Sequence, residues 1–214
     1  MRETPIAREG FKFIIPSLFL ALLFYIFFSY FLAFFSFFFF CFCLYFFRNP
    51  RRASTAPGDS LLSPADGTIT EIKDMIEGEF LDVETRRVSI FMSLANVHVN
   101  RAPRPGRISR ILHRRGEFAL AWKKEIETVN ERNYILIEKD DERILMVQIA
   151  GFLARRITCY VNPGDFVKRG DPVGIIAFGS RVDVYIPKSY ECMVELKQKV
   201  KAGVTPLARK RGSL

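Results

Sequence analysis

A run of 35 residues without a charged side chain, from Phe13 to Phe47, constrains this chain more than any other feature. As one helix it would be roughly 50 Å long, well over the ~30 Å hydrocarbon core of a bilayer. It is also too long for the apolar core of a secretory signal peptide, which has about 7–15 residues. Two arrangements remain: a helical hairpin that turns near Ser29 to Ser36, or a single tilted span with excess length at one interface.

Basic residues flank the apolar run on both sides: Arg2, Arg8 and Lys12 before it, and Arg48, Arg51 and Arg52 after it. Basic flanks prefer the cytoplasmic side of a membrane, so the hairpin, which returns both flanks to one side, is favoured. We therefore expect residues 1–52 to anchor the chain in the cell membrane as a transmembrane or re-entrant α-helical segment. The rest of the chain is expected on the cytoplasmic face.

The overall charge and the cysteines narrow the class of protein further. A formal charge of +9 beside an apolar run suggests an anionic membrane surface as a partner, and no recognisable nucleic-acid motif accompanies it. The four cysteines contain no CxxC pair. This pattern indicates reduced thiols, and neither a disulfide framework nor a zinc site, so we expect no metal. Because no nucleic-acid motif accompanies the charge, we also expect no nucleic-acid partner.

The remainder of the sequence is typical of a β protein. Residues 53–63 are rich in turn formers and are predicted to be a linker. Residues 64–214 contain short β-branched or alternating runs separated by Gly, Pro, Asp and Asn, which favours a mainly β fold of the β-sandwich or barrel-sandwich-hybrid kind. A few short helices are expected near 93–97 and 116–123. The predicted strands are Thr68–Ile72, Arg87–Met92, Arg107–Leu112, Tyr134–Glu138, Ile144–Ala150, Ile157–Val161, Val173–Ala177 and Val182–Ile186.

Three short stretches are candidates for chemistry, although each also has an ordinary interpretation. Asp66 lies in a Pro-x-Asp-Gly turn sequence, His98 is one of only two histidines, and Gly179–Ser180 can simply join two strands. Together they supply a carboxylate, an imidazole and a hydroxyl, the set that activates nucleophiles in many enzymes. Glycine leaves its carbonyl unshielded, and the adjacent nucleophile is the Ser180 hydroxyl. The Gly179–Ser180 bond is therefore one that the protein itself could break.

The order of these motifs resembles the short, archaeal-type form of the phosphatidylserine decarboxylase family over essentially the whole chain. The ordered set is specific, although no single motif is. It consists of the apolar segment followed by Phe46–Arg52, then Ser63–Gly67, Val97–Pro103, Gly116–Phe118, Asn130–Asn133 and Phe178–Asp183. The resemblance implies a pyruvoyl-dependent lyase that decarboxylates phosphatidylserine to phosphatidylethanolamine and CO2. It also implies a zymogen that cleaves itself between Gly179 and Ser180, giving a β chain (1–179) and an α chain (180–214) that form a heterodimer.

The resemblance further implies roles for individual residues. Ser180 Oγ attacks the Gly179 carbonyl, and the resulting ester is converted by β-elimination and hydrolysis into a pyruvoyl group on the α chain. His98 would be the base, with Asp66 orienting and stabilising it. The pyruvoyl group would form a Schiff base with the substrate amine and take the electron-sink role that PLP has elsewhere, so PLP is not expected.

The sequence departs from the larger members of that family at one position. Those members carry two histidines three residues apart, whereas here the second place holds Arg101, which stays protonated and cannot act as a base. Either His98 serves both self-cleavage and decarboxylation, or His113 supplies a second base or acid. Arg101, Arg114 and Arg115 are candidates for holding the lipid phosphate.

Two other interpretations remain open from the sequence. The substrate could be a related seryl-phospholipid such as archaetidylserine, because the headgroup is the same and the residues do not identify the lipid tail. The chain could instead be a membrane-anchored scaffold or binding protein of the same fold that does not cleave. The replacement of the second histidine favours that alternative.

Overall fold

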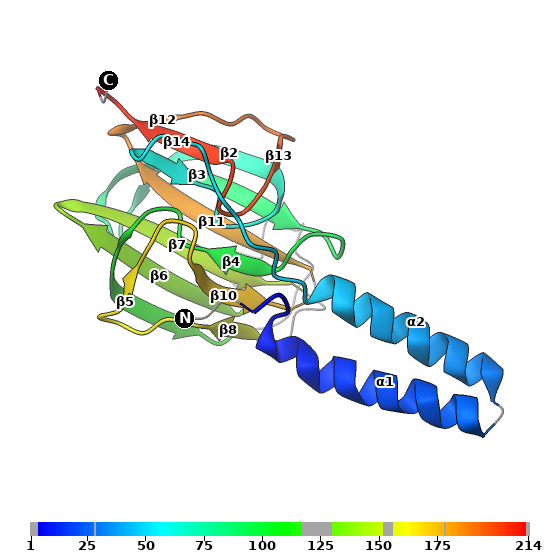
Figure 1. The fold of residues 1–214 in the computed structure, drawn as a ribbon. Helices are drawn as coiled ribbons and strands as arrows, with labels where there is room; N and C mark the ends of the chain where they lie inside the picture. Colours follow the sequence, from blue (N-terminus) through cyan, green and yellow to red (C-terminus); the bar gives the residue numbers. More distant parts are fainter. Residues whose placement is uncertain (1–3, 28, 117–129, 152–155, 178, 213–214) are drawn as a thin grey trace. The chain divides into compact units, whose positions relative to one another are not determined.

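The computed structural model of the protein describes residues 4–27, 29–116, 130–151, 156–177 and 179–212 (Figure 1). The chain forms two compact units, Met1–Arg51 and Arg52–Leu214.

The first unit is helical. It contains the short 3-10 helix η1 (Arg8–Gly10) and two apolar helices, α1 (Phe11–Ile26) and α2 (Tyr30–Phe46), which pack against each other. The first helix is capped at Phe27 and the second at Ser29, the N-terminal edge of the window in which the sequence predicts a turn. At the other end, the amide of Ala7 donates to the carbonyl of Phe47 at 2.8 Å, so the two ends of the hairpin lie side by side.

Most large apolar side chains of these helices are exposed, because a pair of helices can bury only one face of each. Arg8–Ile26 is long and apolar enough to cross a membrane, whereas Tyr30–Phe46 is shorter. Exposed apolar surface on this scale marks a contact with lipid or with another protein. The predicted N-terminal apolar helical segment is thus present, and its insertion into a membrane stays a prediction.

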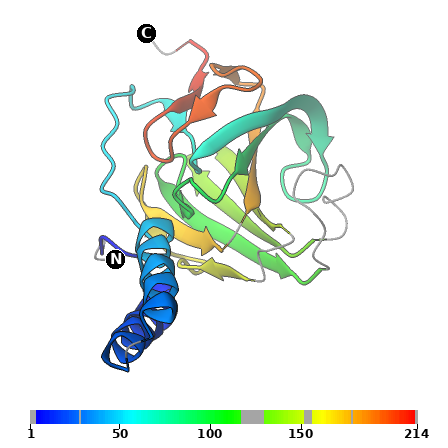
Figure 2. The ribbon, with the colours of Figure 1, turned by 90° about the vertical axis from the view of Figure 1, so that its right-hand side faces the viewer.

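The second unit is built on an eight-stranded antiparallel sheet that curls into an open half-barrel (Figure 2). The strand order is β13–β2–β3–β11–β7–β6–β5–β9. The bounds are β2 Gly67–Glu77, β3 Val83–Met92, β5 Gly106–Arg114, β6 Arg132–Lys139, β7 Glu142–Ala150, β9 Phe166–Val167, β11 Ser180–Pro187 and β13 Lys199–Val200.

Two three-stranded sheets complete the second unit. One has the order β1–β14–β12 and the other β4–β10–β8. The bounds are β1 Ser60–Leu62, β4 Val99–Arg101, β8 Ile157–Cys159, β10 Pro172–Ile176, β12 Tyr190–Cys192 and β14 Pro206–Lys210.

Alternation of side chains explains how this sequence forms its core. On β11, Val182, Val184 and Ile186 point to one face of the sheet and are at most 1% exposed. They pack with apolar residues of the same parity on the neighbouring strands β3 and β7. Each of the eight predicted strand runs forms a strand, and the prediction of a mainly β fold is confirmed.

Two expectations differ from the structure. Residues 93–97 form a turn and not a helix, because the Asn96 side chain accepts hydrogen bonds from the Ser93 amide (2.9 Å) and hydroxyl (2.8 Å). The end of the predicted linker, Ser60–Leu62, forms β1, because Leu61 and Leu62 are buried. The helix expected near 116–123 lies almost entirely outside the described residues.

Candidate active site

Ser180 is the first residue of β11 and faces the core of the second unit. It pairs with Met92 of β3 and Ala150 of β7, and no part of it is exposed to solvent. Its hydroxyl donates to the sulfur of Met92 at 3.4 Å. Gly179, immediately before it, has a φ of +63°, which glycine adopts without strain and other residues rarely do. The suspected bond therefore lies at a left-handed turn leading into a buried strand; the preceding Phe178 lies outside the described residues.

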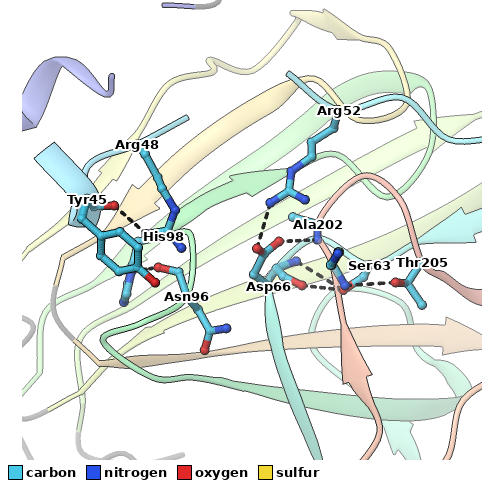
Figure 3. A network of polar contacts seen from close by, with 11 residues as sticks. Tyr45, Arg48, Arg52, Ser63, Asp66, Asn96, His98, Ala202 and Thr205 are labelled. Atoms are coloured by element: carbon cyan, nitrogen blue, oxygen red, sulfur yellow. Dashed lines mark hydrogen bonds and ion pairs between the residues drawn. The ribbon is translucent and has the colours of Figure 1, made fainter. Parts of the chain in front are cut away.

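Asp66 is held in place by two hydrogen bonds, one to each carboxylate oxygen (Figure 3). The Arg52 guanidinium lies 2.8 Å from Oδ2, and the backbone amide of Ala202 donates to Oδ1 at 2.7 Å. Ser63 closes the turn by donating its hydroxyl to the carbonyl of Ala65 at 2.7 Å. Both oxygens of the predicted catalytic carboxylate therefore have partners other than an imidazole.

His98 is fully buried between the turn at 93–97 and β4. Its Nδ1 lies 3.0 Å from the carbonyl oxygen of Asn96 (Figure 3). A carbonyl can only accept, so Nδ1 carries the proton of the neutral ring, and Nε2 is then the basic nitrogen. The group that fixes the tautomer of His98 is thus the Asn96 carbonyl, and the expected action of Asp66 on His98 stays a prediction.

His113, the second histidine, lines a cavity of about 600 Å³ together with Arg115, Glu131 and Arg156. Its Nε2 lies 3.2 Å from Oε1 of Glu131. This cavity adjoins the strand pairing of Ser180, because the Glu131 carbonyl accepts from the amide of Ala150, the residue that pairs with Ser180. The arrangement places an imidazole, a carboxylate and two guanidinium groups around one space close to the strand pairing of Ser180.

Comparison with known proteins identifies the family. The profile of the phosphatidylserine decarboxylase family matches residues 39–208. Phosphatidylserine decarboxylase proenzymes of Carboxydothermus hydrogenoformans and Syntrophus aciditrophicus are 39% and 42% identical over 206 residues each. The proenzyme of Ruegeria pomeroyi is 42% identical over 216 residues. The chain and these relatives each cover 94–98% of one another.

The chain belongs to the phosphatidylserine decarboxylase family. It is accordingly an enzyme, a decarboxylase, and its relatives are made as proenzymes. The agreement in length with these relatives means that the similarity includes both the helical unit and the β unit.

The three arginines predicted to hold phosphate have different surroundings in this decarboxylase. Arg101 is 2% exposed and donates from Nη1 to the Gly170 carbonyl at 2.8 Å. Arg114 forms an ion pair with Glu79. Arg115 lines the cavity beside His113. Of the three, Arg115 is the one that lines this cavity.

Glu131 and Arg156 are two candidate residues that the sequence argument did not select. Glu131 belongs to the Asn130–Asn133 motif, but only the structure shows that its carboxylate reaches His113. Arg156 lies just before β8, and its carbonyl accepts a hydrogen bond from the amide of Ala177 at 3.4 Å, shortly before Ser180 in the chain. Among the described residues, no group of three His, Cys, Asp or Glu side chains is placed to bind a metal ion.

Proposed function

We propose that this decarboxylase converts phosphatidylserine to phosphatidylethanolamine and CO2 with a pyruvoyl group made from its own Ser180. The observation that carries the proposal is a buried serine that follows a glycine in left-handed conformation, in a chain similar along its length to phosphatidylserine decarboxylase proenzymes. The left-handed conformation leaves the Gly179 carbonyl without a neighbouring side chain, so it is open to attack by Ser180 Oγ.

Self-cleavage would begin with removal of the Ser180 hydroxyl proton. His98 is our candidate base, because its hydrogen bond to Asn96 leaves Nε2 as the basic nitrogen. Oγ then attacks the Gly179 carbonyl carbon, the C–N bond breaks, and the released amine takes up a proton. The product is an ester between Gly179 and the side chain of residue 180. Asp66, through Arg52 and the amide of Ala202, would keep the turn before β2 in place during this step.

Two further steps complete the conversion. A base removes the Cα proton of residue 180, the Cβ–Oγ bond breaks, and Oγ leaves with its electron pair as part of the Gly179 carboxylate. Water then hydrolyses the resulting dehydroalanine, releasing ammonia. Ser180 suits this product, because it is the first residue of a strand held on both sides and stays in position after the bond before it is broken. The pyruvoyl ketone supplies an electrophile for the substrate amine and a sink for the electrons left by CO2.

The cavity beside His113 is our candidate for the substrate headgroup. Arg115 and Arg156 supply positive charge for the phosphate, and guanidinium groups bind phosphate oxygens through charge-assisted hydrogen bonds. The His113–Glu131 pair can hold a proton for delivery to the carbon that has lost CO2. His98 would then act in self-cleavage, and His113 in decarboxylation of the substrate.

The helical unit gives this enzyme a route to its substrate. We propose that the apolar helices hold the protein in the cell membrane, with the catalytic unit on the cytoplasmic side where the basic flanks favour it. A lipid substrate would then be reached without leaving the bilayer.

A lipid assay tests the proposed activity. Purified protein mixed with phosphatidylserine in detergent micelles should release CO2 and form phosphatidylethanolamine, and prior treatment with phenylhydrazine, which reacts with ketones, should abolish both. A parallel sample with archaetidylserine tests whether the lipid tail matters. Full activity after phenylhydrazine treatment would contradict the pyruvoyl mechanism, and conversion of neither lipid would contradict the proposed substrate class.

The two chains are predicted to stay together after cleavage. Residues 180–187 form a central strand between β3 and β7, with Val182 and Val184 fully buried. Side-chain bonds also cross between the pieces: the Tyr190 hydroxyl donates to Glu142 at 2.8 Å, and Arg209 pairs with Asp59 at 2.9 Å. Size-exclusion chromatography in mild detergent should recover both pieces in one peak that separates only in denaturant. Separation without denaturant would contradict the prediction.

A further inference from the structure

A line of buried amide side chains leads across the β unit to Ser180. Asn133 donates to Gln148 Oε1 at 2.9 Å, Gln148 donates to Asn100 Oδ1 at 2.8 Å, and Asn100 donates to Met92 Sδ at 3.5 Å. The same sulfur accepts the hydroxyl of Ser180 at 3.4 Å. Each of these residues is at most 1% exposed.

The direction of these hydrogen bonds fixes which end of Asn100 faces the serine. Its oxygen accepts from Gln148, so its NH2 group points to Met92 and the side of Ser180. Hydrogen bonds in such a chain polarise one another, which strengthens the last donor. Asn100 is therefore oriented as a donor toward the sulfur atom that also accepts the Ser180 hydroxyl.

The fold makes room for this line of amides at a specific place. A Cβ added at Gly174 would lie 2.7 Å from the carbonyl oxygen of Thr158 and 2.8 Å from Nε2 of Gln148, so the backbone and the amide together leave room only for glycine. Gly174 also pairs with Asn100 across β10 and β4. Burying three amides in an apolar core is unfavourable unless each is hydrogen-bonded. Yet the line ends on a thioether, which is a weak acceptor.

We propose that Asn100 is the hydrogen-bond donor to Oγ of residue 180 as that oxygen leaves in the β-elimination step. In that step the Cβ–Oγ bond breaks, and Oγ takes the electron pair and becomes an oxygen of the Gly179 carboxylate. The oxygen thus gains negative charge, and a pre-oriented N–H donor stabilises it more than the neutral ester. The Met92 side chain is flexible enough to move aside, so that Asn100 exchanges a weak acceptor for a strong one. Gln148 and Asn133 are positioning residues that act through Asn100.

This inference rests on the proposed self-cleavage at Gly179–Ser180 and predicts that a particular species accumulates. Asn100→Leu keeps similar bulk but has no donor, so its ester should form and then eliminate on the order of a hundredfold more slowly. The ester has the same mass as the intact chain, but hydroxylamine splits it. Treated Asn100→Leu protein should give residues 1–179 as a hydroxamate and a 180–214 piece that begins with an ordinary serine.

Two further variants separate orientation from stability. Gln148→Met has similar bulk but no donor, so the Asn100 oxygen loses its hydrogen bond, its NH2 group is no longer held toward Met92, and the ester should accumulate although Asn100 is present. Ile135→Ala removes core volume from β6 but leaves all three amide groups in place, and should lower thermal stability without ester accumulation.

The possible results lead to distinct conclusions. If the wild-type chain is not cleaved at Gly179–Ser180, the proposed function fails. If the wild type is cleaved but Asn100→Leu matures at the wild-type rate, the role of Asn100 is wrong. The role of Asn100 is also wrong if Asn100→Leu gives an intact chain that hydroxylamine does not split, because the ester has then not accumulated.

Discussion

Ser180→Ala protein is expected to remain one intact chain and to release no CO2 from phosphatidylserine. The substitution removes the oxygen that attacks the Gly179 carbonyl and with it the only route to a pyruvoyl group in the proposed mechanism. Alanine fits the site, because Ser180 is fully buried and its hydroxyl contacts a sulfur and not a strong acceptor. The loss should therefore occur without loss of the fold, which circular dichroism and a thermal melt can check.

Ser189→Ala is the matched control for this experiment. Ser189 belongs to the same short chain of residues 180–214 but is exposed, and its described hydrogen bond uses the backbone carbonyl. The control should cleave and turn over like the wild type. Cleavage of the Ser180→Ala chain after residue 179 would refute the role given to the hydroxyl, and decarboxylation by the uncleaved variant would refute the pyruvoyl mechanism.

His98→Gln is expected to slow self-cleavage by about 10²–10⁴-fold, the range by which a positioned base accelerates a reaction. Glutamine is polar and of similar size, but it cannot accept the Ser180 proton and pass it on. The measurement is the fraction of cleaved chain against time after synthesis in a cell-free system, read on a denaturing gel. A wild-type rate of cleavage in this variant would show that another group is the base.

His113→Gln and Asp66→Asn distinguish the remaining roles. His113→Gln should cleave at the normal rate but decarboxylate slowly, since His113 faces the cavity with Glu131.

Asp66→Asn should affect cleavage less than His98→Gln does, because Asp66 contacts Arg52 and the Ala202 amide, and His98 is oriented by Asn96. If Asp66→Asn equals His98→Gln in its effect on cleavage while its melting temperature is unchanged, Asp66 has a direct part in proton transfer.

The strands of this enzyme were predictable because their side chains alternate. On β11 and β3 every second residue is an apolar residue of the core, and this local pattern needs no knowledge of the partner strand. The turn at 93–97 was not predictable from the same rules, because a single side chain, Asn96, supplies the hydrogen bonds that a helix would have needed. Such short segments depend on one contact and not on a repeating pattern.

Candidate site residues could be chosen from the sequence, and their roles stay predictions, but their contacts could not be read from it. The Gly179–Ser180 bond and His98 stand out from the residue types present and from the order of the motifs. Which polar atoms form hydrogen bonds with each other, however, depends on segments that are far apart in the chain. Asp66 illustrates this, because its partner Ala202 is 136 residues away. A usable signal for the amides was present, since Asn133 and Gln148 occupy core-facing positions in otherwise apolar alternation with Ile135 and Met146. A polar residue at such a position marks a buried network.

The mass of the denatured wild-type protein tests the central claim most directly. The account predicts two species, residues 1–179 ending in an ordinary carboxylate and residues 180–214 lighter by one ammonia than a peptide that begins with serine. That difference corresponds to replacement of the serine amine and hydroxyl by the pyruvoyl group. A single species with the mass of the whole chain in a preparation that decarboxylates phosphatidylserine would contradict the account, as would a 180–214 piece that retains its serine nitrogen.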